Sequence, residues 1–453
     1  MLKKYVVLLL VFLFCNTLQA QELSPSSALK SYVDRPEEKY GWNFVNAKRA
    51  QDYTISNVLL TSQVWQGFTW RHQLTIIIPH ERVYRGALLF VTGGSNHDEQ
   101  PKWQDKPDKT LEGLIAVSLK NKAVVAQIRQ VPNQPFYGGL TEDALISYTL
   151  HNFKKDKDYT WPLLFPMVKS VVKAMDAIQE FADKEFSLSV TKFTISGASK
   201  RGWTSWLTSA INDERVEAIG PMVIDILNMP KSLQYQIDTW GEYSVEIEDY
   251  VKLGIPQSAA TSDGQAITTM IDPYSYKSTM TVPKMIFMGT NDPYWVVDNI
   301  KNYYKDIPAR NMLHYVPNAG HNLGGGEQAL NSLSSFWAYT LQKKPYPDCQ
   351  WELKQKRKEA VLKITATPEN LVGVTLWSAT SPDRDLRNDQ WVSKDLGLPA
   401  DWSKTNVFET KVKLPSSGYQ AFYVDLRYKD PNGQEFTTST RMYLSDSKKV
   451  FID

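Results

Sequence analysis

The sequence predicts an α/β domain built on a doubly wound, mostly parallel sheet, followed by a smaller all-β domain. Two observations predict the larger domain: apolar runs typical of buried strands alternate with helical periodicity up to residue 341, and Gly197-Ala198-Ser199 lies between a short β-branched run and a helix pattern. A third observation predicts the smaller domain, because strand alternation without strong helical periodicity fills the chain after Pro345–Pro347.

The first 20 residues have the features of a secretory signal peptide. Two lysines at positions 3 and 4 precede an apolar core, Val6–Phe14. The segment then ends with Leu18-Gln19-Ala20, which places a small residue at the expected cleavage site. The core is too short to span a bilayer, and Cys15 does not follow a small residue as a lipidation site requires. We therefore expect cleavage after residue 20 and a secreted or periplasmic protein without a stable membrane anchor.

Composition excludes several classes of function. The lysines at positions 3 and 4 account for the net charge of +2, so the remaining chain is formally neutral, which argues against nucleic-acid and anionic-membrane surfaces. Only Cys349 would remain after cleavage, so no disulfide within the chain is expected. There is no His-Glu-x-x-His or Cys-x-x-Cys motif, and Gly324-Gly325-Gly326 does not open a strand–helix crossover. We expect no metal and no other cofactor.

The elements of the larger domain, residues 21–344, follow in order. Residues 21–60 are polar and irregular. Buried strands are predicted by apolar runs at residues 70–78, 86–91, 122–128, 218–226, 284–289 and 312–316. Helical periodicity marks residues 163–182 and 330–341, and the polar, aromatic segment 228–276 is long enough to form a cap or lid.

The smaller domain, residues 345–453, is predicted from alternating apolar residues. Its strands are expected at residues 360–364, 372–377, 408–412, 421–426 and 436–443, with a hairpin turn at Asp430–Gly433. This pattern favours an immunoglobulin-like or fibronectin-like sandwich, a domain type suited to protein or glycan partners. We expect the prolines at 345 and 347 to stiffen the connection and Cys349 to be an unpaired thiol near it.

Candidate catalytic residues occur in the chain order of an α/β-hydrolase: serine, then acid, then histidine. Ser199 would be the nucleophile, activated by an imidazole that an acid orients. His321 follows the last predicted strand, and Asp292 follows the strand before it, with Asp298 as the competing acid. The motif is incomplete, because Arg201 occupies the position of the second elbow glycine and Gly202 follows it.

Backbone amides near Gly94 and at Lys200 are the predicted oxyanion-hole donors, because Gly94 follows a strand and Lys200 follows the nucleophile. The two basic residues beside Ser199 have two interpretations. Lys200 or Arg201 could contact a substrate carboxylate or the developing oxyanion. The favoured interpretation of Arg201 is structural, since a buried arginine usually pairs with an acid and would fix the elbow helix.

The chain resembles the PhoPQ-activated pathogenicity-related proteins, a family that includes autocrine proliferation repressor-like proteins of amoebae. The matching segments lie between about residues 35 and 321, and Ser199–Trp203 is the most specific of them; the others include residues 61–65, 70–72, 92–96, 130–135, 142–144, 272–273 and 316–321. The resemblance implies an α/β-hydrolase-like domain in a secreted or periplasmic setting. The basic residue beside the serine is similar to that in glucuronoyl-esterase-like elbows.

We expect a secreted serine hydrolase, of esterase or peptidase type, that acts on a small-molecule ester, a peptide or a glycan-linked acyl group through Ser199, Asp292 and His321. The alternative is a non-catalytic signalling, adhesion or virulence-associated protein on a hydrolase scaffold. A third interpretation is processing of carbohydrate esters, with surface aromatic residues as a sugar platform.

Overall fold

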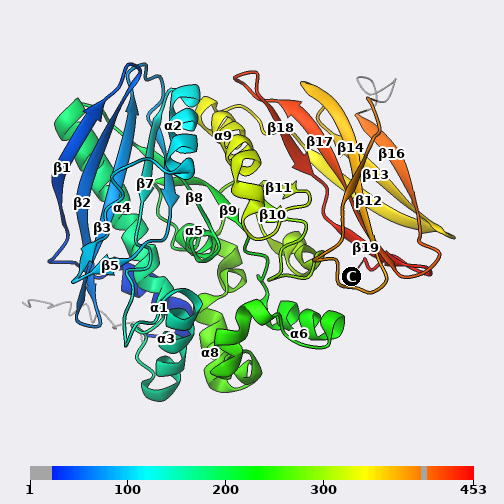
Figure 1. Ribbon diagram of the computed structural model, residues 1–453, viewed down its shortest axis with the longest axis horizontal. Coiled ribbons are helices and arrows are strands. Elements are labelled where there is room, and N and C mark those ends of the chain that lie inside the picture. Colours follow the sequence, from blue (N-terminus) through cyan, green and yellow to red (C-terminus); the bar gives the residue numbers. More distant parts are fainter. Residues whose placement is uncertain (1–22, 399–405, 453) are drawn as a thin grey trace, which may run out of the picture.

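A single large mixed sheet runs through the molecule. Figure 1 shows the computed structural model, which describes residues 23–398 and 406–452. The predicted signal peptide, residues 1–20, lies outside the described residues. The strand order is β1-β2-β3-β7-β4-β8-β9-β10-β11-β18-β17-β14-β15, and β19 pairs with β17. The central part, from β7 to β11, is parallel. This order and the helices on both faces are those of an α/β-hydrolase.

The hydrolase part of the sheet begins with three antiparallel strands and continues with six parallel ones. Their bounds are β1 Gly41–Arg49, β2 Tyr53–Trp65, β3 Phe68–Pro79, β4 Gly86–Val91, β7 Val124–Ile128, β8 Lys192–Ala198, β9 Val216–Met222, β10 Lys284–Gly289 and β11 Asn311–Val316. A separate hairpin is formed by β5 Asn96–His97 and β6 Gln100–Pro101.

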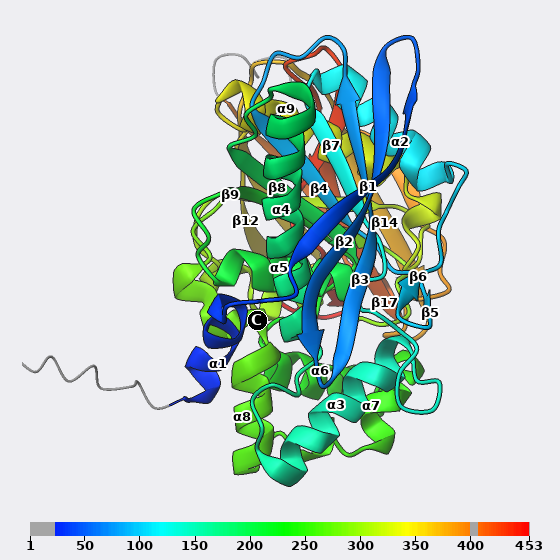
Figure 2. The same cartoon turned by 90° about the vertical axis from the view of Figure 1, so that its left-hand side faces the viewer.

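Helices cover both faces of this sheet, because each buries an apolar stripe against it. On one face α4 (Leu164–Phe186) and α5 (Lys200–Ala210) share a core with the strands, and on the other α2 (Lys109–Asn121) and α9 (Glu327–Gln342) do so. Figure 2 shows the sheet between α4 and α2. The parallel strands therefore end at one edge, where the loops that carry Ser199, Asp292 and His321 meet.

A helical segment covers this edge of the sheet. It includes residues 228–276, which the sequence predicted as a cap or lid, and α3 packs beside it. Its elements and neighbours are α1 Pro25–Asp34, α3 Glu142–Asp156, α6 Met229–Trp240, η1 Val245–Ile247, α7 Glu248–Lys252, η2 Pro256–Ser258, α8 Ser262–Ile271 and η3 Pro273–Thr279. Short turns follow at η4 Asn299–Asn302, η5 Tyr304–Asp306 and η6 Leu323–Gly325.

The C-terminal part consists of two antiparallel sheets that share an apolar core. One is β12-β13-β16, and the other is β18-β17-β14-β15 with β19. The second sheet joins the hydrolase sheet through one pair, Leu313 with Ser439. Cys349 is a free thiol at the start of β12. The bounds are β12 Cys349–Lys356, β13 Glu359–Ala366, β14 Leu371–Ser381, β15 Val392–Asp395, β16 Val407–Lys413, β17 Tyr419–Lys429, β18 Glu435–Ser439 and β19 Tyr443–Asp446.

Three expectations about secondary structure were wrong. The strand predicted over residues 436–443 is two strands, β18 and β19, separated by residues 440–442. Residues 21–60 are not irregular, since they contain α1, β1 and the first part of β2. β1 is exposed along most of its length, so its sequence lacks the apolar run that reveals a buried strand. The strand predicted over residues 218–226 ends at Met222, because Val223 has a φ of 50° and turns the chain out of the sheet.

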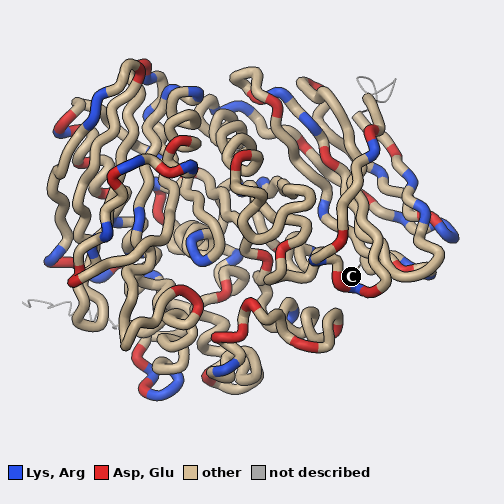
Figure 3. The backbone as a smooth tube through the Cα atoms, in the orientation of Figure 1, with Lys and Arg blue, Asp and Glu red and all other residues tan. Residues whose placement is uncertain are grey.

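Charges of both signs are mixed along the described residues, and few aromatic side chains are fully exposed. Lys and Arg are interspersed with Asp and Glu along the backbone (Figure 3). Among the described aromatic side chains, only Phe44 is exposed. Many of the other tryptophans and tyrosines are half-buried, among them Trp42, Trp161 and Trp240. Across the described ranges, no helix is both long and apolar enough to cross a membrane.

Candidate active site

Ser199 lies on the sharp turn between β8 and α5. Its backbone has φ 58° and ψ −128°, a conformation that a residue with a side chain rarely adopts. The turn is held by two hydrogen bonds, from Ser199 N to Met222 O (3.0 Å) and from Trp203 N to Ser199 O (2.9 Å). This strained strand–turn–helix geometry lifts the hydroxyl above the sheet edge, as in a nucleophile elbow.

Two glycines explain how the elbow tolerates Arg201 in place of the usual glycine. A Cβ at Gly197 would lie 2.8 Å from Val91 O, and a Cβ at Gly202 would lie 2.5 Å from Met222 O. The close approach of α5 to β9 therefore falls at Gly202, one residue later than the motif predicts. The displaced glycine leaves position 201 free for a long side chain.

The structure brings Ser199, His321 and Asp292 into contact from three separate loops. His321 Nε2 lies 2.9 Å from Ser199 Oγ, and His321 Nδ1 lies 2.8 Å and 3.0 Å from the two carboxylate oxygens of Asp292. When Nδ1–H donates to Asp292, Nε2 accepts from the Ser199 hydroxyl. Asp292 is 5% exposed, so the carboxylate is shielded from solvent. This geometry suits removal of the serine proton.

Asp298, the competing acid, lies elsewhere. It is fully buried, accepts a hydrogen bond from Tyr235 OH at 2.8 Å and pairs with Lys301 at 3.2 Å. Of the two acids that the sequence offered, Asp292 is the one in contact with His321. The sequence did not single out Tyr294, which stacks on His321 with ring centroids 4.1 Å apart and donates its backbone N–H to Asp292 at 3.0 Å.

The candidate oxyanion-hole residues lie at the ends of β4 and β8. Lys200 is the first residue of α5, so its amide N–H has no acceptor within the helix. Gly93 lines a groove together with Ser199 and His321. Gly94 follows with a φ of 145°, and its carbonyl accepts a hydrogen bond from Gln134 Nε2 at 3.1 Å. The loop after β4 is thus held beside the nucleophile.

Arg201 is engaged by an acid, as the structural interpretation predicts. Its guanidinium donates to both carboxylate oxygens of Glu142 (2.8 and 2.7 Å) and to Val131 O (2.5 Å). Burial raises the pKa of Glu142, but the hydrogen bonds and charge of Arg201, with contributions from Gln134 and Lys200, outweigh it and lower that pKa to about 2. A Cβ at Gly93 would lie 2.4 Å from the Arg201 guanidinium, so the pair also packs against the loop after β4.

Lys200 is paired as well. Its ammonium lies 2.5 Å from Asp143, which also accepts from Tyr250 OH at 2.9 Å. Both basic residues beside Ser199 are therefore neutralised by the consecutive acids Glu142 and Asp143 at the start of α3. In the sequence, two consecutive acids are visible at positions 142 and 143, but their local pattern does not indicate that they pair with residues 200 and 201.

Two cavities meet at Ser199. On one side lies an apolar pocket walled by the elbow helix, the loop after β9 and the helical segment 228–276. On the other side lies a larger groove that is more polar than the pocket, formed by the loop after β4, α2 along most of its length, the first part of α9, and the Gly324–Gly326 turn. Within residues 23–398 and 406–452, no group of His, Cys, Asp or Glu is arranged to hold a metal ion.

Comparisons with known proteins match most of the chain. A family model described as PhoPQ-activated pathogenicity-related protein matches residues 29–387. Autocrine proliferation repressor protein A of Dictyostelium discoideum is 28% identical over 456 residues, which cover 94% of this chain and 90% of that protein. Acetyl xylan esterase 1 from Thermoanaerobacterium sp. JW/SL YS485 is a solved structure with 15% identity, a TM-score of 0.49, and coverage of 69% of this chain and 93% of that one. The glucuronoyl esterase from Solibacter usitatus has 12% identity, a TM-score of 0.40, and coverage of 68% and 90%.

Proposed function

Because the chain belongs to the family of PhoPQ-activated pathogenicity-related proteins, whose name describes regulation rather than a reaction, we propose the reaction from the site: this protein is a serine hydrolase that cleaves carboxylic esters. The single observation that carries the proposal is the continuous hydrogen-bond chain from Ser199 Oγ through His321 to Asp292. Backbone strain of the kind found at Ser199 clusters at functional sites, which supports catalysis over a non-catalytic scaffold.

In the proposed first step Ser199 Oγ attacks the ester carbonyl while His321 Nε2 takes the hydroxyl proton. The carbonyl electron pair moves to oxygen, and the amides of Lys200 and the Gly93–Gly94 loop donate to the resulting oxyanion. When the carbonyl reforms, the bond to the alcohol oxygen breaks and the proton on His321 passes to that oxygen. The products of this step are the free alcohol and an acyl group on Ser199.

The second step repeats the sequence with water. His321 takes a proton from a water molecule, the hydroxide attacks the acyl carbonyl, and Ser199 leaves with the proton returned by His321. Asp292 keeps its charge throughout and stabilises the imidazolium that forms twice in each cycle. The acid product and the free enzyme are released. We further propose that this chemistry takes place outside the cytoplasm, since residues 1–20 read as a secretory signal.

Active-site labelling tests the proposal directly. A fluorophosphonate probe should label the protein lacking residues 1–20, and Ser199→Ala should abolish the labelling. Ser205→Ala is the matched control, because Ser205 is a buried serine of α5 that bonds only to the Arg201 carbonyl. On p-nitrophenyl esters, Ser199→Ala should lose at least about 10⁴-fold in kcat.

Absence of labelling in a folded protein would exclude the hydrolase and favour the signalling or adhesion alternative. Hydrolysis of aminoacyl anilides without ester hydrolysis would reassign the enzyme as a peptidase.

A further inference from the structure

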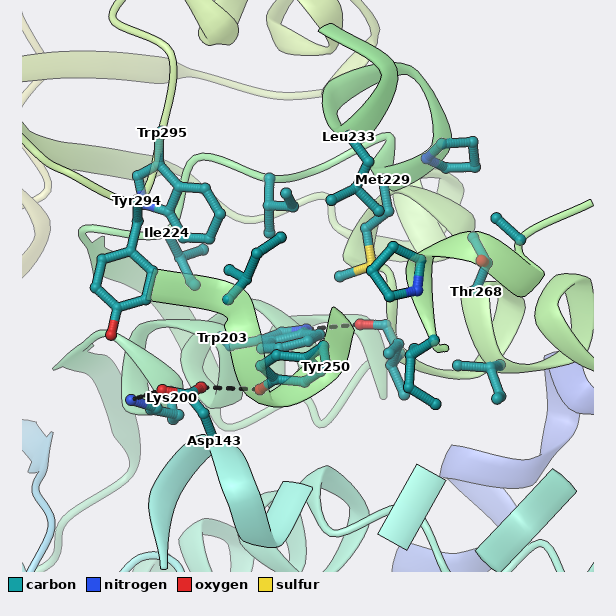
Figure 4. A pocket seen from close by; sticks show the side chains of 18 of the residues that line it. Asp143, Lys200, Trp203, Ile224, Met229, Leu233, Tyr250, Thr268, Tyr294 and Trp295 are labelled. Carbon is teal, nitrogen blue, oxygen red and sulfur yellow. Dashed lines mark hydrogen bonds and ion pairs between the residues drawn. The ribbon is translucent and has the colours of Figure 1, made fainter. Parts of the chain in front are cut away.

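The apolar pocket beside Ser199 is a chamber with one polar end. Figure 4 shows Lys200 and Asp143 at that end, with Leu233 and Met229 farther along and Thr268 at the opposite side of the view. The helical segment 228–276 supplies most of the wall, through residues of α6, η1, α7, η2 and α8. The interior volume is about 80 Å³, several times the roughly 10–15 Å³ that one water molecule requires. The chamber therefore has room for a chain of several carbon atoms.

The wall of the chamber is mainly apolar, and several of its polar groups already have partners, whereas the hydroxyls of Tyr294 and Thr268 stay free. The indole N–H of Trp203 donates to Ile271 O at 2.6 Å, and that of Trp295 donates to Val223 O at 3.3 Å. The hydroxyl of Tyr250 is used by Asp143. A polar ligand group placed away from the hydroxyls of Tyr294 and Thr268 would lose its hydrogen bonds to water without replacement, which is costly. The remaining wall is largely isoleucine, with methionine, leucine and proline.

The charges at the mouth cancel. Asp143 and Lys200 are the charged residues that line the chamber, and they form an ion pair 2.5 Å long. An anionic acyl group would have to draw Lys200 away from Asp143, and a cationic acyl group would have to draw Asp143 away from Lys200. Both would leave a partly buried charge without its partner.

From these three observations we propose that the chamber is the acyl-binding site, and that it selects esters of uncharged, aliphatic acyl chains longer than acetyl. The alcohol part of the ester then lies in the larger groove on the other side of Ser199. This inference rests on the proposed function, because it assigns a substrate class to the same nucleophile. It makes Leu233, halfway along the wall, a specificity-determining residue.

A chain-length series tests the acyl site. Burial of each methylene contributes about 0.8 kcal/mol, which corresponds to about fourfold in kcat/KM. We expect kcat/KM for p-nitrophenyl esters to rise by about this factor per methylene from acetate through butyrate and hexanoate until the chamber is full. The hemisuccinate ester, which resembles butyrate in length but carries a carboxylate, should react at least tenfold more slowly than butyrate.

A pair of tryptophan variants localises the effect. Leu233→Trp places an indole in the chamber and should lower the hexanoate-to-acetate ratio of kcat/KM at least tenfold. Gln234→Trp is the matched control, because Gln234 is the next residue of α6 and is exposed; it should keep the wild-type ratio. Leu233→Ala widens the chamber and should move the acyl chain length with the highest kcat/KM to longer chains. This variant keeps the test valid if Leu233→Trp does not fold.

The outcomes separate this inference from the proposed function. If fluorophosphonate labels Ser199 and esters are cleaved, but acetate is the best substrate or both tryptophan variants change the ratio equally, the acyl-site assignment is wrong while the hydrolase stands. If Ser199 is neither labelled nor active on any ester, the proposed function fails and the acyl site falls with it.

A second inference comes from a different part of the molecule, the contacts between the candidate triad loops and the C-terminal sandwich. The side-chain amide of Asn291, next to Asp292, donates to the carbonyls of Leu386 (3.3 Å), Arg387 (3.2 Å) and Asp389 (2.8 Å). Asn318, three residues before His321, exchanges two hydrogen bonds with the backbone of Trp391, at 3.0 and 2.7 Å.

The two loops are also tied to each other. Thr290 Oγ1 accepts from Asn318 N at 2.9 Å and donates to Asn291 Oδ1 at 2.8 Å. Asn318 has a φ of 56°, a conformation that this residue type tolerates better than most. A single segment of the sandwich, residues 386–391, thus contacts both the loop of the acid and the loop of the base. We propose that this segment positions Asp292 and His321, so that Asn291 and Asn318 are positioning residues for the reaction.

The test is a split between kcat and KM. Asn318→Ala and Asn291→Ala should lower kcat about tenfold or more, with KM for a short ester changed less than twofold, since neither side chain lines the acyl chamber. Arg384→Ala is the control, because Arg384 also bridges the two parts but contacts Asp238 O and Tyr235 OH instead of the triad loops. It should keep the wild-type kcat. Equal losses in all three variants, or loss of thermal stability with kcat preserved, would reduce the segment to a structural contact.

Discussion

The rings of Tyr294 and His321 are stacked, with centroids 4.1 Å apart and 28° between their planes. Tyr294 also donates its backbone N–H to Asp292. One residue therefore restrains both the base and the acid of the candidate triad, from the turn that carries the acid. Its ring is half-buried and also lines the apolar chamber.

Replacing this ring should slow the reaction without abolishing it. Aromatic pairs contribute about 0.5–1.5 kcal/mol beyond their buried area, so we expect Tyr294→Leu to lower kcat about 3- to 10-fold. Tyr294→Phe keeps the stacked ring and should remain within twofold of the wild type. Steady-state kinetics on p-nitrophenyl butyrate measure both. A wild-type kcat for the leucine variant would mean that His321 is held in place without the stack.

The acid of the triad can be identified by two amide substitutions. Asp292→Asn removes the charge that stabilises the imidazolium and favours the wrong imidazole tautomer, so kcat should fall about 10³- to 10⁴-fold. Asp298→Asn should affect stability far more than kcat, because Asp298 pairs with Lys301 and Tyr235 instead of His321. Thermal unfolding and kinetics of the two variants decide between them. A larger kcat loss in the Asp298 variant would contradict the assignment.

The ion pair between Glu142 and Arg201 should make stability depend on pH in the acid range. The pKa of Glu142 is lowered from 4.5 to about 2 in the folded protein. A depressed pKa means that the stabilisation is complete above about pH 4.5 and is lost as the pH falls towards 2. Glu142→Gln should therefore cost about 1–3 kcal/mol at neutral pH and flatten this part of the curve. Urea unfolding between pH 3 and 7 measures it, with the exposed Glu38→Gln as control.

The position of Gly202 predicts a steric effect on the elbow. A Cβ there would lie 2.5 Å from Met222 O, a backbone atom that cannot move without shifting β9. We expect Gly202→Ala to destabilise the protein by about 1–3 kcal/mol and to slow fluorophosphonate labelling. Gly41→Ala, at a glycine with no atom within 4 Å of the added Cβ, should do neither. Equal stability of the two variants would show that α5 can move away from the sheet.

The sequence predicted the parts of the site that depend on chain order and local turns. Ser199, Asp292 and His321 each follow an apolar strand, so their positions could be read from strand ends. It did not reveal Glu142, Tyr294, Asn291 or Asn318 as site residues, because their roles depend on partners far away in the chain. β1 was missed for a similar reason, since an exposed edge strand carries no apolar pattern of its own.

Residues 386–391, which contact the loops of the candidate triad, are synthesised after all three of its residues. The nucleophile, acid and base are all synthesised before residue 322, whereas the carbonyls that hold Asn291 and Asn318 follow 65 or more residues later. Domains that fold during synthesis form from the N-terminus onwards. A chain that ends before residue 386 therefore contains all three candidate reacting groups, but the loops that carry Asn291 and Asn318 lack the backbone partners that we propose align them.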